Sequence, residues 1–406
     1  MLIIGEKCYP GGIKLAMGTN MSDEKPKWMP GEENVTLHPG LKEVYLDNTK
    51  ISYIDGDKGR LFYRGYSIET LAENSTFEEV VFLLIHGHLP SRYELFTLKD
   101  TLKNERELPD RVLMILKSFP RETTRIEILR TIISALALFD PDDYDYSKEA
   151  NIRKGLRIIA KIPTIMAYSH RIKSNLPIIE PDPDLSHAAN FYYMVTGNKP
   201  DKEIEAAFDK ALILQSEHGS NASSFAARVT VSTLSDIYSA VVSAIGALRG
   251  PLHGGANERV ILMLKEIGEP ERAEEFIMEK LNKHERIMGF GHRVYKTRDP
   301  RADIYEQMAN YWCNKTGNQK LMEISKILCD VMMRERKLAP NVDFFSATFS
   351  YAIGLPILLF TPLFAASRSA GWVAQTLEQL DENVMIRPLM RYQGDINRKY
   401  RPIDDR

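Results

Sequence analysis

Apolar side chains recur along most of the chain at the spacing of one helical face. One such stripe consists of Ile126, Leu129, Ile132, Ile133 and Leu136. This periodicity is typical of amphipathic helices that bury one face. Alternating apolar and polar runs are scarce, and the best of them, "VYLDNTKISYI" at residues 44–54, predicts one short hairpin at most. We therefore predict an all-α chain.

Local sequence also marks where several helices begin and end. Thr76 with Glu79, and Ser91 with Glu94, have the spacing of a capping box, in which side chains satisfy free N–H groups of the first helical turn. Gly87 is placed to end the first of these helices in a left-handed turn. The longest apolar run, residues 352–366, is interrupted by two prolines and is too short to cross a bilayer. We predict buried helix there.

Composition and charge exclude several classes of protein. The 406 residues are 44% hydrophobic, and 53 basic against 55 acidic side chains leave a net charge of -2. This balance offers no field to recruit nucleic acid or an anionic membrane. Cys8, Cys313 and Cys329 form no C-x-x-C pair and no even disulfide framework, which favours a reducing, cytoplasmic setting. Residues 1–40 lack periodicity, so we expect an N-terminal arm or disordered extension there.

Several common catalytic motifs are absent from the sequence. It contains no G-x-x-x-x-G-K-[ST] phosphate loop, no G-x-S-x-G nucleophile elbow and no H-E-x-x-H zinc motif. The segment "GFGHRV", residues 289–294, has a valine where a dinucleotide fingerprint needs its third glycine. We therefore expect none of these sites.

The segment "PLHGGANE", residues 251–258, places His253 just after a helix predicted over residues 238–248. The two glycines that follow allow the backbone to turn sharply or to approach a ligand closely. An imidazole in such a turn can donate a hydrogen bond into a cleft. The alternative is a histidine held by neighbouring backbone groups at a helix boundary.

A second histidine, His292, lies in a strongly cationic segment, residues 289–301. The N–H groups around Gly289 and Gly291 suit a phosphate or an adenine edge. Four cations oppose a single aspartate in the following residues: Arg293, Lys296, Arg298 and Arg301 against Asp299. We expect a polyanionic ligand here, with a solvated charged face as the alternative.

Asp343 stands between Val342 and two phenylalanines, so its carboxylate is expected to be partly desolvated, with a raised pKa that suits a general base. The alternative is an aspartate that caps the following helix. Arg368 and Arg387 occupy apolar or turn-forming contexts, where a guanidinium needs a carboxylate from a ligand or from the protein. Together these residues predict a site for a small dicarboxylate and a phosphate-bearing co-substrate.

These segments resemble those of the citrate synthase family, which includes the 2-methylcitrate synthases. The resemblance runs from "ISYIDGDKGRLFYRGYSIETLAENSTFEEVVFLLIHGHLP" at residue 51 to "RPLMRYQG" at residue 387, in order and with family-like spacing. It covers nearly all of the chain beyond residue 40.

By position, the resemblance implies an acyltransferase of the tricarboxylic acid cycle with three catalytic residues. His253 would hydrogen-bond the thioester carbonyl of acetyl-CoA while Asp343 removes a methyl proton. The resulting enol or enolate would attack the ketone of oxaloacetate, which His292 polarises, and hydrolysis would release citrate and CoA. Because a thioester methyl is a very weak acid, a carboxylate can deprotonate it only if a positioned donor stabilises the enolate oxygen.

The resemblance also implies the binding residues. His218, Arg301, Arg368 and Arg387 would bind oxaloacetate, and Arg387 would come from the neighbouring subunit of a homodimer. The adenine of CoA would meet a loop formed by Arg286, Ile287, Met288, Gly289 and Phe290, with Arg293 and Lys296 available to its phosphates. No metal and no tightly bound cofactor is implied.

The fold implied by the resemblance is a helical one with two domains. Residues 41–254 and 355–406 would form a large helical domain, and residues 255–354 a small helical domain inserted into it. His253 would then lie near the hinge, where closure over oxaloacetate completes the site before the CoA chemistry begins.

Three positions depart from the family pattern. Gly219 stands where many members carry a glutamate, Gln375 where a histidine is frequent, and Leu389 where a second arginine is common. Gly219 puts in question how His218 is held in place. Leu389 puts in question a contact to a CoA phosphate.

Three alternatives stay open at this point. Propionyl-CoA can replace acetyl-CoA, giving a 2-methylcitrate synthase or a dual-specificity enzyme, because one extra methylene changes affinity by only about 1–3 kcal/mol. A metal-dependent lyase would use as metal ligands His218, His253, His292 and Asp343. A non-catalytic CoA-binding protein would bind its ligands at this site but would not convert them to products.

Overall fold

The computed structural model describes residues 36–392, 395 and 397–406, which fall into two units. The longer unit, Asn48–Ile386, contains all the α-helices and the sheet of the described residues. The shorter unit combines Met1–Asp47 with Arg387–Arg406 and has two 3-10 turns among its described residues, η1 (Pro39–Leu41) and η4 (Ile403–Asp405). Most of the arm predicted over residues 1–40 lies outside the described residues, as does Cys8.

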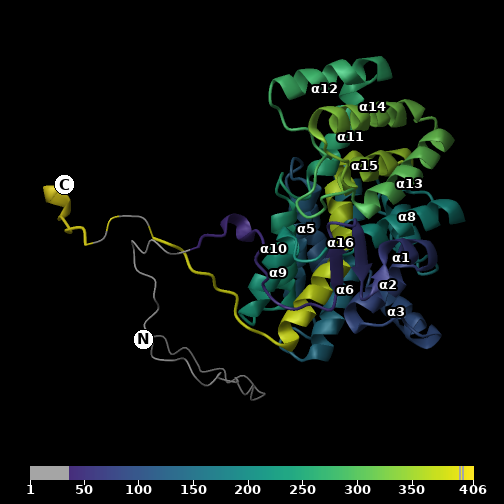
Figure 1. Ribbon diagram of the computed structural model, residues 1–406. Helices are drawn as coiled ribbons and strands as arrows, with labels where there is room; N and C mark the ends of the chain where they lie inside the picture. Colours follow the sequence, from purple (N-terminus) through teal and green to yellow (C-terminus); the bar gives the residue numbers. More distant parts are fainter. Residues whose placement is uncertain (1–35, 393–394, 396) are drawn as a thin grey trace. The chain divides into compact units, whose positions relative to one another are not determined.

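The longer unit is almost entirely helical, which confirms the predicted all-α class (Figure 1). Its helices before His253 are α1 (Ile68–Asn74), α2 (Phe77–His86), α3 (Arg92–Asn104), α4 (Asp110–Ser118), α5 (Arg125–Ala137), α6 (Lys148–Lys173), α7 (His187–Thr196), α8 (Lys202–Gln215), α9 (Ala222–Ser232) and α10 (Ile237–Leu248). Those after it are α11 (Ala256–Ile267), α12 (Ala273–Asn282), α13 (Pro300–Thr316), α14 (Gln319–Arg336), α15 (Val342–Ala352) and α16 (Phe360–Asp381), with 3-10 turns η2 (Pro270–Arg272) and η3 (Ile357–Leu359).

The predicted helix ends are confirmed. Thr76 and Ser91 each form a complete capping box with the glutamate three residues on, and Gly87 ends α2 in the left-handed conformation, with φ of 87°. The helix predicted over residues 238–248 is α10. These features depend on interactions within a few residues, which is why local sequence is sufficient to find them.

The predicted hairpin lies farther along the chain than expected. The structure has a three-stranded antiparallel sheet made of β1 (Ser52–Asp55), β2 (Arg60–Tyr63) and β3 (Tyr66–Ser67). Residues 44–51 are outside it, so the prediction over residues 44–54 was wrong except at its end. The turn forms instead at residues 56–59, where Gly59 adopts a φ of 63°.

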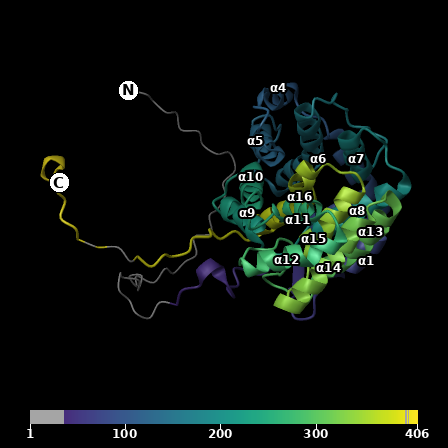
Figure 2. The ribbon, with the colours of Figure 1, turned by 90° about the horizontal axis from the view of Figure 1, so that it is seen from above.

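Helix α16 passes through the middle of the longer unit, as the two views in Figures 1 and 2 show. It contacts helices from both halves of the sequence, among them α2, α6, α8, α9, α10 and α11. Its length was underestimated from sequence, because Ile357–Asp381 is long and apolar enough to cross a membrane by length and composition alone. However, 89% of its most apolar window is buried inside the protein, which confirms the predicted burial. The helix predicted over residues 352–366 is confirmed only from Phe360 onward, because α15 ends at Ala352 and a loop with η3 separates it from α16.

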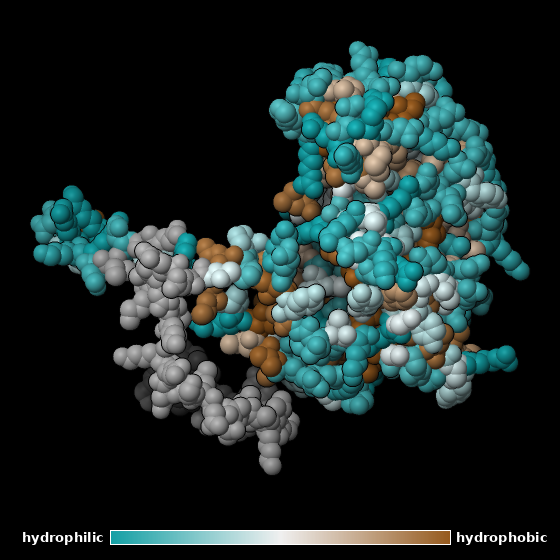
Figure 3. All heavy atoms as spheres, in the orientation of Figure 1, coloured by the Kyte–Doolittle hydropathy of each residue, from teal (hydrophilic) through white to brown (hydrophobic). Residues whose placement is uncertain are grey.

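Helices α11 to α15 lie together at one end of the longer unit in Figure 1. α13 and α11 both pack against α15, and α12 packs against α14. The division into a small domain at residues 255–354 and a large domain elsewhere stays a prediction. The visible surface of the longer unit is mostly hydrophilic, with smaller hydrophobic patches (Figure 3).

Candidate active site

Six predicted site residues lie at helix ends or on α16 within the longer unit. His218 follows α8, His253 lies between α10 and α11, and His292 precedes α13. Arg301 and Asp343 occupy the first turns of α13 and α15, and Arg368 lies on α16. Burial lowers the pKa of His218 most, and the nearby Arg301, His292, Arg368 and His253 lower it further. Asp343 interacts in the same way with Arg301 and Arg368. The structure therefore brings these six side chains together from distant parts of the sequence.

His292 is held in one tautomer. Its Nδ1 accepts hydrogen bonds of 3.0 Å from the backbone N–H groups of Val294 and Tyr295. A nitrogen that accepts two N–H groups carries no proton, so the neutral ring bears its proton on Nε2. Burial, followed by the charge of Arg301, lowers the pKa of His292 to about 4 and keeps the ring neutral near pH 7. Its Nε2–H can therefore polarise a carbonyl.

His253 belongs to a hydrogen-bond chain that reaches α16. Its Nε2 lies 2.9 Å from the hydroxyl of Ser223, which also accepts from the indole N–H of Trp372 at 3.0 Å. The Ser223 hydroxyl donates to Asn221 Oδ1 at 2.7 Å, so its only proton is used there and His253 Nε2–H must donate to it. Burial lowers the pKa of His253 to about 4. The partner is thus a side chain, not the neighbouring backbone of the alternative interpretation.

The carboxyl group of Asp343 has the properties expected of a general base. Burial raises its pKa to about 7, although the positive charge of Arg301 lowers it. Its Oδ1 is buried and has no hydrogen-bond partner among the described residues. The alternative role as a cap is excluded, because Asn341 is the N-cap of α15 and accepts from the N–H of Asp343.

The two buried arginines differ in how their charges are balanced. Arg301 donates from Nε and Nη2 to both oxygens of Asp299, at 3.0 and 2.7 Å, and its Nη1 has no partner within the described ranges. Arg368 donates from Nε to the backbone carbonyl of Gln215 and makes no ion pair with a described residue. Burial lowers its pKa to about 10 against the opposing charge of Glu217. Both guanidinium groups therefore retain capacity for an anion.

Arg387, the seventh of these residues, lies in the shorter unit and is exposed. Its role as a ligand that a partner subunit supplies stays a prediction. The same holds for Leu389, which is 63% exposed in that unit.

The predicted CoA loop lies against the segment that precedes Asp343. Gly291 N–H donates to Ala339 O, and Asn341 N–H donates to Gly289 O. Gly289 has a φ of 85°, and a Cβ there would come within 2.7 Å of the Phe344 ring, so glycine is required. Ile287 and Phe290 are buried, Met288 is half-buried, and Arg286 and Arg293 are exposed.

A small cavity of about 90 Å³ lies beside this loop. One of its lining residues, Lys337, was not identified from the sequence. Lys337 lies at the end of α14 and lines the cavity together with His292, Tyr295 and Lys296. Lys296 itself forms an exposed 2.8 Å ion pair with Asp57. No signal in the local sequence singles out Lys337, because its place depends on how α14 packs.

Further residues that were not identified from the sequence contact the segment around His218. Tyr295 lies 3.3 Å from His218 Nε2, and the hydroxyl of Tyr63 donates to the backbone carbonyl of Glu217 at 2.8 Å. Gly219 adopts a φ of 59° and donates its N–H to Ser52. A glutamate there would be strained, and His218 is supported by Tyr295 instead.

Three side chains of the site are close enough to hold a cation. Ligand atoms of His218, His292 and Asp299 lie within 4.8 Å of one another. Both Asp299 oxygens already accept from Arg301, however, and His292 Nδ1 accepts two backbone N–H groups. A metal ion would have to compete with these donors, so the set fits a metal poorly.

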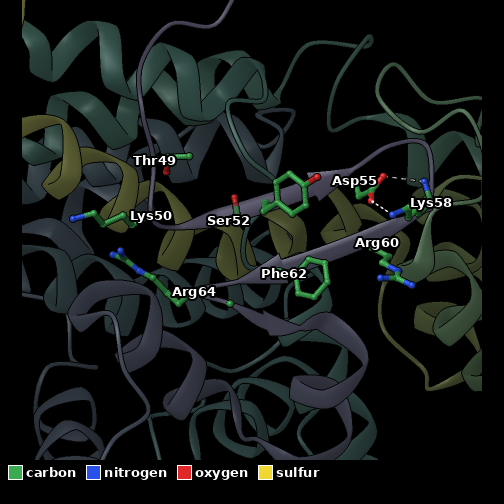
Figure 4. A pocket seen from close by; sticks show the side chains of 10 residues that line it. Thr49, Lys50, Ser52, Asp55, Lys58, Arg60, Phe62 and Arg64 are labelled. Atoms are coloured by element: carbon green, nitrogen blue, oxygen red, sulfur yellow. Dashed lines mark hydrogen bonds and ion pairs between the residues drawn. The ribbon is translucent and has the colours of Figure 1, made fainter.

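A larger pocket, of about 510 Å³, lies on the outer face of the sheet and holds none of the predicted site residues. Figure 4 shows Lys58 and Arg60 at one end and Lys50 and Arg64 at the other, with Phe62 between them. One of its lining residues, Ser52, hydrogen-bonds to Glu217 and Gly219 on either side of His218, but no predicted catalytic side chain lines the pocket.

Comparison with known proteins gives one consistent result. A family model described as "Citrate synthase, C-terminal domain" matches residues 40–389. The chain is 46% identical to citrate synthase 2 of Bacillus subtilis, over 92% of this chain and 100% of that protein. It is 39% identical to 2-methylcitrate synthase 1 of Corynebacterium glutamicum, over 91% and 98%. Among solved structures, the citrate synthase of Thermoplasma acidophilum with carboxymethyl coenzyme A and oxaloacetate has a TM-score of 0.88, at 36% identity over 91% of this chain and all of that chain.

Proposed function

The chain belongs to the citrate synthase family and is a condensing enzyme, and we propose that it joins acetyl-CoA to oxaloacetate through the residues described above. The observation that carries this proposal is the convergence of a desolvated carboxylate, two neutral imidazoles and two buried guanidinium groups. These are the groups needed to ionise a weak carbon acid next to a bound dianion.

In the proposed reaction, Asp343 removes a proton from the methyl group of acetyl-CoA, and His253 stabilises the developing enolate oxygen. Because His253 Nε2–H points to Ser223 in the free enzyme, the donor role falls to Nδ1. Rotation of the Ser223 hydroxyl from Asn221 towards Nε2 allows the ring to carry its proton on Nδ1. His253 would therefore change tautomer when the thioester binds.

Oxaloacetate would be held by Arg301, Arg368 and His218, with His292 Nε2–H on its ketone oxygen. Arg368 supports this assignment because it has no ion pair with a described residue, and a buried guanidinium without an anion is costly. Arg301 is paired with Asp299, but its Nη1 has no partner among the described residues and is available to a ligand. Carbon–carbon bond formation moves negative charge onto that oxygen, where His292 donates. Water then cleaves the thioester and releases CoA.

The proposal includes the assembly and the setting. Arg387 would enter the site of a partner subunit in a homodimer, and the relatives' similar length supports a shared architecture. The free thiols of Cys313 and Cys329 support a reducing, cytoplasmic setting. No tightly bound cofactor is part of the proposal.

The experiment that tests the function is CoA-thiol release with a thiol-reactive dye. Wild type is assayed with oxaloacetate and either acetyl-CoA or propionyl-CoA, with and without chelator, beside Asp343→Asn. We expect CoA release that depends on oxaloacetate, is unaffected by the chelator and is lost in the Asp343→Asn variant. Loss of activity in chelator would establish the metal-dependent alternative, and no release with either thioester would overturn the condensing function. The ratio of kcat/KM for the two thioesters distinguishes citrate from 2-methylcitrate synthesis.

A further inference from the structure

Glu217 is a fully buried carboxylic acid that the proposed mechanism does not use. Its Oε1 accepts from Ser52 Oγ at 3.0 Å and from Gln375 Nε2 at 2.9 Å. Its Oε2 is buried and has no hydrogen-bond partner in the part of the chain that the structure describes. Burying a carboxylate with one oxygen that lacks a hydrogen bond costs free energy of folding. The presence of such a group next to His218 therefore suggests a functional role.

Helix α16 packs against Glu217 unusually closely. A Cβ at Gly371 would lie 2.4 Å from Glu217 Oε2 and 2.3 Å from the Ser216 carbonyl, so only glycine fits. Arg368 and Gln375 lie three residues before and four residues after Gly371, on the same face of the helix. The carboxyl group is therefore enclosed between a guanidinium and an amide of one helix.

The charge facing Glu217 is that of Arg368. The two groups make no direct ion pair, but Glu217 opposes the effect of burial on the pKa of Arg368 more than any other group does. Arg301, by contrast, has its own carboxylate in Asp299. Arg368 is also the guanidinium to which the proposed function assigns a carboxylate of oxaloacetate. Substrate and Glu217 would therefore place two negative charges around one cation.

We propose that Glu217 is a positioning residue that balances Arg368 while the site is empty and takes up one proton from solvent when oxaloacetate binds. This inference rests on the proposed function, because it assigns a substrate carboxylate to Arg368. The proton converts the ionised carboxylate to the neutral acid, so the substrate anion becomes the charge partner of Arg368. Burial already raises the pKa of Glu217, although Arg368, Gln375 and Ser52 lower it. A second anion nearby raises it further.

The groups around Glu217 are Ser52 on β1, Tyr63 and Arg64 at the end of β2, His218 and Gly219 in the loop, Arg368 and Gln375 on α16, and Arg228 on α9. A second carboxylate, that of Glu378 on α16, also interacts with Arg64 and has its own ion pair with Arg228. Gln375 Oε1 accepts from Arg228 Nε at 2.6 Å, which fixes its amide so that Nε2 points to Glu217. A histidine at this position, as is frequent in the family, would add an ionisable group that the glutamine avoids.

The test is calorimetric titration of oxaloacetate into the full-length protein in two buffers of different ionisation enthalpy. The difference in observed heat gives the number of protons taken up. We expect uptake approaching about one proton per site at pH values between the pKa of Glu217 in the free protein and its higher pKa in the complex, and a fall in oxaloacetate affinity of up to about tenfold per pH unit as pH rises through that window. Uptake on binding means that the affinity weakens, not strengthens, with rising pH.

Two variants separate Glu217 from the other titrating groups. Glu217→Gln should bind oxaloacetate without proton uptake and with an affinity that no longer weakens with pH. Asp343→Asn is the matched control, because its carboxyl group also has a raised pKa, and uptake should persist there. Binding without uptake by wild type, uptake that persists in Glu217→Gln, or uptake that disappears in Asp343→Asn would overturn the proposal.

A third variant serves if Glu217→Gln does not fold. Ser52→Ala removes one donor from the ionised carboxylate, so the pKa of Glu217 rises and the fall in affinity should move to higher pH. An unchanged pH dependence would overturn the proposal. The proposed function fails by a different result, the absence of oxaloacetate-dependent CoA release from wild type.

Discussion

The carboxyl group of Asp343 shows how far single side chains depend on their surroundings here. The same aspartate on a surface would be ionised above about pH 4. Inside this site, burial raises its pKa to about 7 despite the nearby Arg301. A base with this pKa is ionised near neutral pH but retains a useful affinity for a proton.

The first prediction at this scale concerns the pH profile. The ratio kcat/KM for acetyl-CoA, measured at saturating oxaloacetate, should rise about tenfold per pH unit below about pH 7 and level off above it. The direction follows because Asp343 acts in its ionised form, which is lost as pH falls through the raised pKa. A profile that stays level down to about pH 5 would show that the carboxyl group has its ordinary acidity and would contradict the assignment.

His253→Ala is the second prediction for a single residue. It should lower kcat by about 10²-fold or more, by analogy with the loss of an oxyanion donor. The fold should survive, because the ring makes one side-chain hydrogen bond, to Ser223. Steady-state kinetics and a thermal unfolding curve measure the two effects. Unchanged turnover in a folded variant would remove His253 from the mechanism.

At the scale of elements, α16 positions the site from the centre of the unit. It carries Arg368, the proposed oxaloacetate ligand, and it supplies Gln375 to Glu217 and Trp372 to the Ser223 hydroxyl that holds His253. These three side chains repeat at helical spacing along one element. Any shift of α16 would therefore disturb several parts of the site at once.

A pair of glycine variants tests this close packing. Gly371→Ala adds a Cβ 2.3 Å from the Ser216 carbonyl, so it should destabilise the protein by about 1–3 kcal/mol and weaken oxaloacetate binding. Gly246→Ala in α10 is the matched control, because nothing described lies within 4 Å of its Cβ position. It should stabilise the protein by about 0.5–1 kcal/mol, the usual gain for alanine over glycine in a helix. Equal effects of the two in chemical denaturation would contradict the packing argument.

At the scale of the whole molecule, the open question is where Arg387 acts. It lies in the shorter unit with the C-terminal residues, whereas the other residues proposed to bind oxaloacetate lie in the longer unit. A site shared between two copies can be tested by subunit complementation.

The prediction is that two inactive variants restore each other's activity. Arg387→Ala and Asp343→Asn should each be inactive, and equal amounts unfolded and refolded together should recover about one quarter of wild-type activity. Half of randomly mixed dimers are hybrids, and one of the two sites in each hybrid is intact. If Arg387 acts within its own chain, no hybrid has an intact site and the mixture stays inactive. Coexpression of the two variants provides the same test where refolding fails.

Local sequence was sufficient for the helices and the reactive side chains. The periodic stripes, the capping boxes at Thr76 and Ser91, and the turn at Gly87 depend on interactions within one or two helical turns. His253, His292 and Asp343 stood out because glycines or aromatic side chains flank them. The family resemblance added their roles, and the comparisons confirmed the family.

Only the tertiary structure decided what these side chains contact. The hydrogen bond of His253 to Ser223, the enclosure of Glu217 by α16, and the cavity beside Lys337 join residues that are far apart in sequence. The pKa of Asp343 and the tautomer of His292 follow from burial and from neighbouring charges, which no local pattern encodes. Helix formation depends on near neighbours along the chain, whereas desolvation and charge pairing depend on near neighbours in space.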